Sequence, residues 1–202
     1  MTAHSKEGRS TDAEPSRRQG IVATAAGLFV RYGFRKTSMD DIARASKLSR
    51  QGLYLHFSNK EDVFGAVVTR LGDATLSAVR TSLEPDGRSL EARLVAAFAS
   101  MTSESVGTAD PVNVQELLAA AKELVGDIVV RLDDEIVSAL AGALTQGRKR
   151  GARAARREPT PRALAELLYA TSYGLKYRGH VGDDYINRMR VAIHVVCKSE
   201  EV

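Results

Sequence analysis

The amino-acid sequence predicts an all-α protein, and two observations support this. It holds only five prolines and no tryptophan in 202 residues, and long stretches rich in alanine, leucine, arginine and glutamate favour helix over strand. Apolar residues recur at helical rather than strand spacing in one segment after another. A chain of this length can bury the cores of a small domain and a medium one.

Composition also indicates the compartment of the protein. The lone Cys197 cannot form an internal disulfide, which is typical of a chain kept in a reducing compartment. No window approaches 18 uninterrupted apolar residues, and residues 1–10 lack an apolar signal core. We therefore expect a cytoplasmic protein with no membrane partner.

Positive charge is concentrated in the first 60 residues. They hold 11 lysines and arginines against 5 aspartates and glutamates, whereas the remainder of the chain holds 18 against 20. Such an excess is the electrostatic footprint that nucleic-acid binding requires, but a basic solvated surface would give the same count. Charge alone leaves both interpretations open.

The first helix is expected to follow a polar arm. Residues 1–14 show no apolar periodicity and are expected to be disordered. From Ser16 the pattern becomes helical, and Gly33 offers a stop. The apolar stripe lies on one side of this helix, which therefore needs packing partners; it consists of Ile21, Ala25, Leu28, Phe29 and Tyr32.

A short helix is expected next. Thr37 or Ser38 can cap its start, because both side chains carry an oxygen that accepts from free backbone N–H groups. Asp40 and Asp41 then lie in its first turn, where negative charge is favourable for the helix dipole.

A second short helix is expected from Arg50 to Phe57. Ser49 can cap it, and residues 46–48 make a tight connection to the helix before. Leu53 and Phe57 are expected to be buried, while the first turn projects into solvent. Two short helices joined by a three- or four-residue turn, after a longer helix, match the helix-turn-helix plan.

The remainder of the chain is expected to be helical as well. Ser58 and Glu61 form a capping-box pattern for a long connector helix over about residues 59–81, and Pro85 and Gly87 interrupt the pattern after it. Further helices are expected from residue 90, over 114–121, over 123–145, and in a closing pair over 162–178 and 183–198.

Residues 21–64 carry the most specific pattern in the chain. It consists of the runs AAGLFVRYGF, TSMDDIARA and LSRQGLYLHFSNKEDVF, in this order and with the matching helix spacing. On these residues the segment resembles the DNA-binding domain of TetR-type transcriptional regulators. Beyond residue 81 the likeness is architectural: a helical domain that ends in two helices, the first containing LLYATSYGLK.

The resemblance implies a division of labour along the chain. Residues 1–14 would be the arm, 15–60 the helix-turn-helix DNA-binding domain, and 61–202 a helical domain for effector binding and dimerisation. The sequence departs from the usual family pattern at two places in the DNA-binding segment. Lys47 stands at a turn position where the family often has glycine, so this lysine is expected to adopt a positive φ. Gln51 and Gly52 replace the more frequent glycine and threonine, which changes the surface offered to bases.

Ten residues are expected to contact DNA. Arg50 and Gln51 suit guanine and adenine edges respectively, Gly52 permits close backbone approach, and Ser49 can reach a phosphate as well as cap its helix. Phosphate contacts are further expected from Thr37, Ser38, Lys47, Tyr54, His56 and Lys60. The alternatives are that Tyr54 belongs to the core, that His56 is simply solvated, and that Arg50 and Lys60 are ordinary surface charges.

One such domain touches few base pairs, so specificity calls for a two-fold dimer on a near-palindromic operator. The apolar faces of helices 162–178 and 183–198 are suited to a four-helix dimer interface, as the resemblance also implies. These faces are Leu164, Leu168, Thr171 and Leu175 in the first helix, and Ile186, Met189, Ile193 and Val196 in the second. The alternative is that they pack within one subunit.

A small-molecule effector is expected in the central region, whose inner faces carry few charges. The resemblance implies that the bound effector would tilt the connector helix and move the two DNA-recognition helices of the dimer, residues 50–57 of each subunit, out of register with the operator. The candidate ligand contacts are Phe98, Met101, Leu118, Tyr169 and Tyr173, although such residues are more often simple core. The expected outcome is repression relieved by an apolar ligand; the alternative is a dimer controlled by a protein partner without an effector.

Other kinds of site find little support. The chain has no nucleophile, P-loop, dinucleotide or zinc-protease motif, so we expect neither an enzyme nor a cofactor. His194 and Cys197 lie three residues apart, which is too few ligands for a metal, and none is expected. Residues Arg148 to Arg157 include six basic side chains that either form a solvated loop or contact DNA or an acidic partner.

Overall fold

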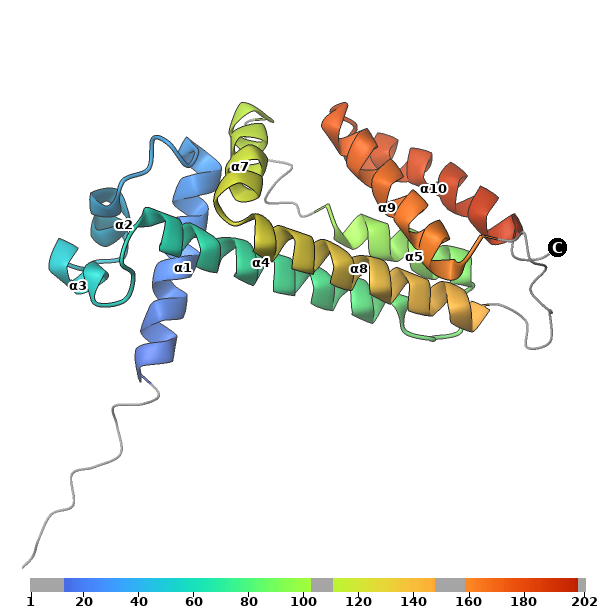
Figure 1. Ribbon diagram of the computed structural model, residues 1–202, viewed down its shortest axis with the longest axis horizontal. Helices are drawn as coiled ribbons and strands as arrows, with labels where there is room; N and C mark the ends of the chain where they lie inside the picture. Colours follow the sequence, from blue (N-terminus) through green and yellow to red (C-terminus); the bar gives the residue numbers. More distant parts are fainter. Residues whose placement is uncertain (1–12, 103–110, 148–158, 200–202) are drawn as a thin grey trace, which may run out of the picture. The chain divides into compact units, whose positions relative to one another are not determined.

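The computed structural model describes residues 13–102, 111–147 and 159–199, and within these ranges the chain is helical with no strand (Figure 1). The expectation of an all-α fold is confirmed. The basic stretch from Arg148 to Arg157 and most of the predicted arm lie outside the described residues. The helices are α1 (Ala13–Tyr32), α2 (Met39–Ala45), α3 (Arg50–Tyr54), α4 (Lys60–Leu83), α5 (Leu90–Ser100), α7 (Pro111–Leu124), α8 (Gly126–Gly147), α9 (Pro161–Tyr177) and α10 (Gly182–Ser199).

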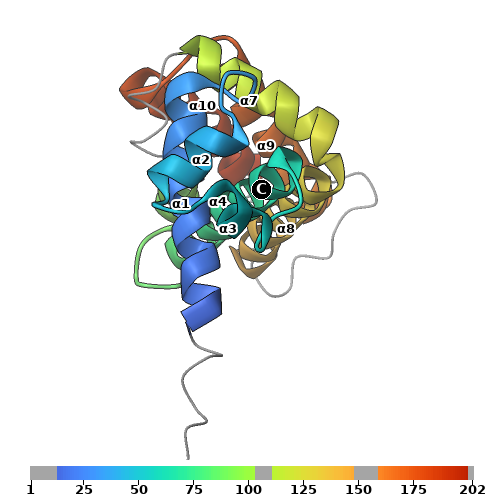
Figure 2. The same ribbon diagram turned by 90° about the vertical axis from the view of Figure 1, so that its left-hand side faces the viewer.

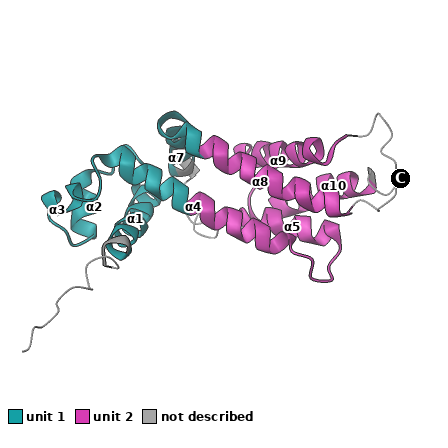
Figure 3. Cartoon of the chain, turned by 60° about the horizontal axis from the view of Figure 1, so that its bottom comes forward, with its two compact units in different colours: residues 1–70, 109–128 teal, residues 71–108, 129–202 magenta. Residues whose placement is uncertain are grey.

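The chain divides into two compact units, coloured separately in Figure 3. Unit 1 comprises residues 1–70 and 109–128, and unit 2 comprises residues 71–108 and 129–202. The start of α4 and the whole of α7 therefore belong with the N-terminal helices. The assignment of residues 15–60 and 61–202 to separate functions stays a prediction.

Unit 1 is built around three phenylalanines. The rings of Phe29 and Phe64 meet edge to face with centroids 5.3 Å apart, and Phe34 lies 4.8 Å from Phe64. Figure 2 shows α1 and α2, which supply part of this core, side by side in unit 1. Such aromatic pairs add stability beyond the area that they bury. The helix-turn-helix elements are thus anchored on one continuous apolar cluster.

Helix α1 ends where Gly33 adopts a φ of 82°, as its sequence position predicts. A Cβ at this residue would lie 2.8 Å from Oε2 of Glu116 in α7, so the flexible carboxylate would have to move, but the positive φ alone already favours glycine here. The same carboxylate accepts a hydrogen bond of 2.8 Å from the backbone N–H of Arg35. Helix α7 thereby holds the link between α1 and α2, an association that sequence periodicity did not reveal.

The helix starts follow local capping chemistry. Ser38 caps α2 and forms a capping box with Asp41, and Ser49 caps α3. The capping box predicted for Ser58 and Glu61 is wrong by one residue. Asn59 Oδ1 accepts from the N–H of Asp62 at 2.7 Å, and the Asp62 carboxylate accepts from the N–H of Ser58. The pattern S-x-x-E was present, but the neighbouring Asn59 and Asp62 offered the same chemistry in register with the helix.

Unit 2 has its own apolar core, in which α10 lies against both α5 and α9. Tyr185 is fully buried here, and its hydroxyl lies 2.7 Å from that of Ser172, so each polar atom has a partner. None of the helices in the described ranges has the length and apolarity needed to cross a membrane.

The structure corrects the residues expected at the dimer interface. Leu164, Leu168, Met189, Ile193 and Val196 are buried within the core of unit 2 itself, so packing inside one subunit accounts for them. Both helices carry a second apolar set that remains exposed: Leu167, Tyr173 and Tyr177 on α9, and Val191 and Val195 on α10.

Lys176 gives unit 2 a pH-dependent stability. Its Nζ donates to the carbonyl of Met101 at 3.3 Å and lies 5.4 Å from the centre of the Tyr185 ring. Burial of this ammonium group lowers the pKa of Lys176 to about 8, although the residue as a whole is exposed. Between pH 8 and 10.5, the ordinary pKa of a lysine, Lys176 holds its proton more often in the unfolded chain than in the folded protein. The free energy of unfolding therefore rises with pH through this window.

Replacing this lysine should expose the cost of its charge. We expect Lys176→Met to raise the free energy of unfolding at pH 7 by about 1 kcal/mol or less, since solvent screens part of the penalty. The gain should shrink as pH rises from 8 to 10.5. Urea titrations at several pH values measure both effects. Lys198→Met, at an exposed position of α10, is the control and should show neither. A loss of stability in Lys176→Met at pH 7 would contradict the expectation.

Candidate nucleic-acid interface

The connection between α2 and α3 has a defined backbone geometry. The N–H of Leu48 donates to the carbonyl of Ala43 at 2.9 Å, and that of Lys47 to Arg44 at 3.1 Å, which is the paired hydrogen-bonding pattern of a Schellman helix end. Lys47 stands at the position where this motif favours glycine, and its φ of 55° confirms the sequence-based expectation. The lysine side chain is exposed.

Relieving this conformation should stabilise unit 1. A side chain in the left-handed region is disfavoured by roughly 1–2 kcal/mol, part of which the greater freedom of unfolded glycine offsets. We expect Lys47→Gly to raise the free energy of unfolding by about 0.5–1 kcal/mol. Lys47→Ala removes the same charge but keeps the Cβ, and should show no such gain in thermal denaturation. Equal midpoints for the two variants would refute the strain account.

The front of α3 is exposed while its back is anchored. Leu53 is fully buried, and Ser49 Oγ accepts from the N–H of Gly52 at 3.0 Å. Arg50 and Gln51 project from the first turn into solvent. The helix ends at Tyr54 rather than at Phe57 as predicted, and Phe57 is buried beyond it. A short, capped helix with exposed hydrogen-bonding groups at its start can approach base edges.

Arg50 makes two contacts on this surface. Its Nη1 donates to Asp40 Oδ2 in α2 at 3.0 Å, and its guanidinium carbon lies 5.7 Å from the centre of the Tyr54 ring. Interaction with the Tyr54 side chain, and then the charge of Asp40, raise the pKa of Arg50. Both partners of the ion pair remain more than half exposed. The arginine is therefore held in place without being removed from the reach of a ligand.

Three further candidates lie around α3. Lys60 donates to the carbonyl of Phe34 at 3.0 Å and lies 4.2 Å above that ring, which leaves two of its three donors for a phosphate. Tyr54 is exposed rather than part of the core, and His56 is half-buried. Seven of the candidates lie in the turn, in α3 or just after it, whereas Lys60 opens α4; the seven are Lys47, Ser49, Arg50, Gln51, Gly52, Tyr54 and His56.

Thr37 and Ser38 differ from the other candidates. Thr37 is 3% exposed, and its hydroxyl donates to the carbonyl of Gly33 at 2.8 Å. Both the N–H and the hydroxyl of Ser38 donate to Asp41 Oδ2. The Thr37 hydroxyl is therefore used by the residue that ends α1, and the Ser38 donors are used to start α2, so neither side chain offers a donor to phosphate without breaking an internal bond.

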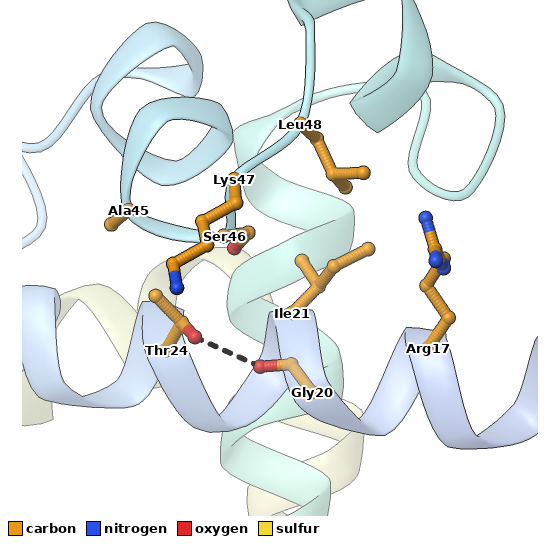
Figure 4. A pocket seen from close by; sticks show the side chains of 8 residues that line it. All are labelled: Arg17, Gly20, Ile21, Thr24, Ala45, Ser46, Lys47 and Leu48. Carbon is orange, nitrogen blue, oxygen red and sulfur yellow. Dashed lines mark hydrogen bonds between the residues drawn. The ribbon is translucent and has the colours of Figure 1, made fainter.

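Basic residues near the start of α1 were missed by sequence analysis. Arg17 and Lys47 lie at opposite sides of a shallow pocket of about 360 Å³ between α1 and the turn, with the Ser46 hydroxyl between them (Figure 4). Arg18 covers the ring of Phe57 at 4.2 Å. The adjacent arginines within the basic N-terminal region were the available signal. The pocket is lined by Arg17, Gly20, Ile21, Thr24, Ala45, Ser46, Lys47 and Leu48.

The five candidate ligand contacts do not form one group. Phe98 is fully buried in the core of unit 2, whereas Tyr173 is 58% exposed. Leu118 lies in unit 1, on an exposed position of α7. Of the five candidates, Met101 and Tyr169 are the two that are half-buried in unit 2. The Tyr169 hydroxyl donates to Asp133 Oδ1 at 2.5 Å. Burial, aided by this bond, raises the pKa of Tyr169, which stays a neutral donor.

No metal site is apparent in the described part of the chain, where no three histidine, cysteine or acidic side chains gather in a way that could hold an ion. His194, one of the two residues considered for a metal, instead lies 3.3 Å from the carboxylate of Glu91.

Comparison with known proteins bears on the helix-turn-helix segment most directly. Residues 21–67 match the family model of bacterial regulatory proteins of the tetR family. A transcriptional activator from Mycolicibacterium smegmatis, FasR, is 37% identical over 67 residues, which are 33% of this chain and 31% of FasR. The transcriptional repressor ComR of Escherichia coli is 30% identical over 86 residues, 43% of this chain and 41% of ComR. The matched segments thus span less than half of these relatives.

The fold extends the likeness to the remainder of the chain. The structure of Salmonella enterica GusR superposes with a TM-score of 0.67 at 24% identity, covering 91% of this chain and 96% of GusR. The helices after the N-terminal segment therefore have the arrangement seen in that protein. Residues 21–67 thus carry the DNA-binding segment of the tetR family of bacterial regulatory proteins, and the described chain as a whole shares the fold of GusR.

Proposed function

We propose that the protein is a dimeric, sequence-specific DNA-binding regulator, which acts as a repressor and is released from its operator by a small apolar ligand. The family itself consists of DNA-binding transcription factors, which agrees with the expectation that the chain is not an enzyme. Similar proteins include both activators and repressors of transcription, since FasR is an activator and ComR a repressor.

The observation that carries the proposal is the exposed first turn of α3. Arg50 can donate hydrogen bonds to base edges, and Gln51 can both donate and accept them. They are the first two residues of α3, directly after the capping Ser49. Lys47 and Lys60 flank this turn in sequence and offer cationic donors for phosphates. The buried Leu53 packs the short helix on the core of unit 1, while the first turn of the helix faces solvent.

Dimerisation is supported by the apolar side chains that unit 2 leaves exposed. Leu167 and Tyr177 lie ten residues apart on α9, and Val191 and Val195 one turn apart on α10. Large exposed apolar patches are typical of interaction surfaces. A two-fold pairing of α9 and α10 with their copies would bury these side chains in a four-helix arrangement.

The proposed effector site lies in unit 2. Met101 and Tyr169 are the candidates that remain half-buried in unit 2, and a ligand here would reach apolar surface together with one oriented hydroxyl. Helix α4 is continuous from unit 1 into unit 2, so a ligand that favours one arrangement of its second half could bias the position of its first.

The direct test is selection of bound fragments from a pool of random duplexes by the purified protein. The proposal expects enrichment of a near-palindromic sequence and two subunits per duplex in analytical ultracentrifugation. Addition of apolar metabolite mixtures should lower the retained fraction. Equal retention of random and selected duplexes at moderate salt would overturn sequence-specific binding, and release by a protein fraction alone would favour the partner-controlled alternative.

A further inference from the structure

The ion pair between Asp40 and Arg50 joins the two short helices across the surface proposed to face DNA. Asp40 lies in the first turn of α2, and its Oδ2 accepts from Arg50 Nη1 at 3.0 Å. Ring contact with Tyr54, one turn further along α3, supports the guanidinium from a second side. The side chain that is best suited to reading guanine is therefore already oriented before DNA is present.

Stability does not explain this pair. The Arg50 side chain is 62% exposed and that of Asp40 51%, and ion pairs as exposed as this contribute little to folding. Nor is Asp40 needed to cap α2, because Asp41 supplies the capping box with Ser38. The charge of Asp40 is favourable for the dipole of α2, but a carboxylate on a surface that meets phosphates is also repelled by them, and Asp41 alone would supply a first-turn charge.

We propose that Asp40 is a specificity-determining residue that acts through Arg50: its carboxylate holds the guanidinium in the geometry that reads one base pair. The inference rests on the proposed DNA-binding function. An arginine has several rotatable bonds, and it recognises guanine through two parallel hydrogen bonds that require a fixed plane. With one N–H group engaged by Asp40, the remaining donors on the fork can meet O6 and N7 with less loss of freedom on binding.

The experiment compares base preferences of the full-length wild type and Asp40→Asn, using the duplex selected by the wild type and its single-base-pair variants. We expect the wild type to discriminate against substitution at one base pair per half-site by about tenfold or more. Asp40→Asn should reduce this ratio about fivefold at that pair while leaving the other positions unchanged. Arg50→Ala should abolish discrimination at the same pair, and Asp40→Asn should have no further effect in that background.

Two controls separate orientation from charge and from folding. Glu61→Gln removes one negative charge from an exposed position of α4 in unit 1 and should leave the preference profile intact. Thermal denaturation of Asp40→Asn should show no more than the small downward shift expected when a first-turn carboxylate of a helix is neutralised. If Asp40→Asn tightens or weakens binding to all duplexes by one common factor, the carboxylate acts by repulsion or by bracing the helices, and the inference is overturned.

Failure of the inference differs from failure of the proposed function. A wild type that selects a sequence, beside an Asp40→Asn variant with the same profile, overturns only the role of Asp40. A wild type that selects no sequence overturns the proposed function and this inference with it.

Discussion

Phe64→Ala is expected to unfold most of unit 1 and to abolish DNA binding. Phe64 is 2% exposed, and its ring contacts both Phe29 and Phe34. Truncation of a buried phenylalanine costs about 3–5 kcal/mol, because apolar contact is lost and a cavity remains. This is a large share of the roughly 5–15 kcal/mol that stabilises a typical domain. The helix-turn-helix elements pack on this same cluster, so they should lose their positions together.

The measurement is urea unfolding followed by circular dichroism, together with retention on the selected duplex. Phe64→Leu keeps an apolar side chain and should cost about 1–2 kcal/mol, with reduced but measurable DNA binding. Leu71→Ala is the matched control on the same helix, since Leu71 is 51% exposed and its truncation should change stability by about 0.5 kcal/mol or less. An unchanged unfolding midpoint in Phe64→Ala would contradict the role given to the aromatic cluster.

Local chemistry made much of the fold predictable from sequence. Ser49 caps α3 as expected, Ser38 is the cap of α2 out of the two candidates Thr37 and Ser38, and Gly33 ends α1 with a positive φ. These features depend on hydrogen bonds within four or five residues, which a sequence displays directly. The positive φ of Lys47 was expected from the resemblance, because the family often has glycine at this turn position; the structure supplies the physical reason, a helix end that requires a left-handed residue whatever its side chain.

Features that depend on distant residues were not predictable in the same way. Helical periodicity identified apolar stripes on α9 and α10, but only packing shows that Leu168 and Met189 serve the core of unit 2. Asp40 and Arg50 are ten residues apart and on different helices, so their contact follows from the angle between those helices. The placement of α7 in unit 1 likewise depends on Glu116 meeting a backbone N–H 81 residues away.

Charge placed on the exposed stripe of α10 is expected to separate the proposed dimer. Val191 and Val195 are 67% and 63% exposed, and they lie one turn apart on the helix. Aspartate at either position would have to lose its hydration in a two-fold apolar interface, where it also meets its own symmetry copy. We expect Val191→Asp to weaken dimerisation at least about tenfold, and the double variant with Val195→Asp at least about 100-fold.

Loss of the dimer should be visible in DNA binding without damage to the subunit. Sedimentation at micromolar concentration should give the monomer mass for the double variant, and its affinity for the near-palindromic duplex should fall by a similar factor because each half-site is then bound separately. Helical content should be retained, since both valines lie outside the core of unit 2.

The control for this experiment is Val130→Asp. Val130 lies on α8 and is 69% exposed, so it has nearly the same exposure as Val191 and receives the same substitution. If exposure alone governs the response, the two single variants should behave alike; if α10 forms the interface, only Val191→Asp should shift the equilibrium towards monomer. A double variant that remains dimeric with unchanged affinity would move the interface away from this face, because two buried carboxylates per subunit cannot be accommodated there without a measurable cost.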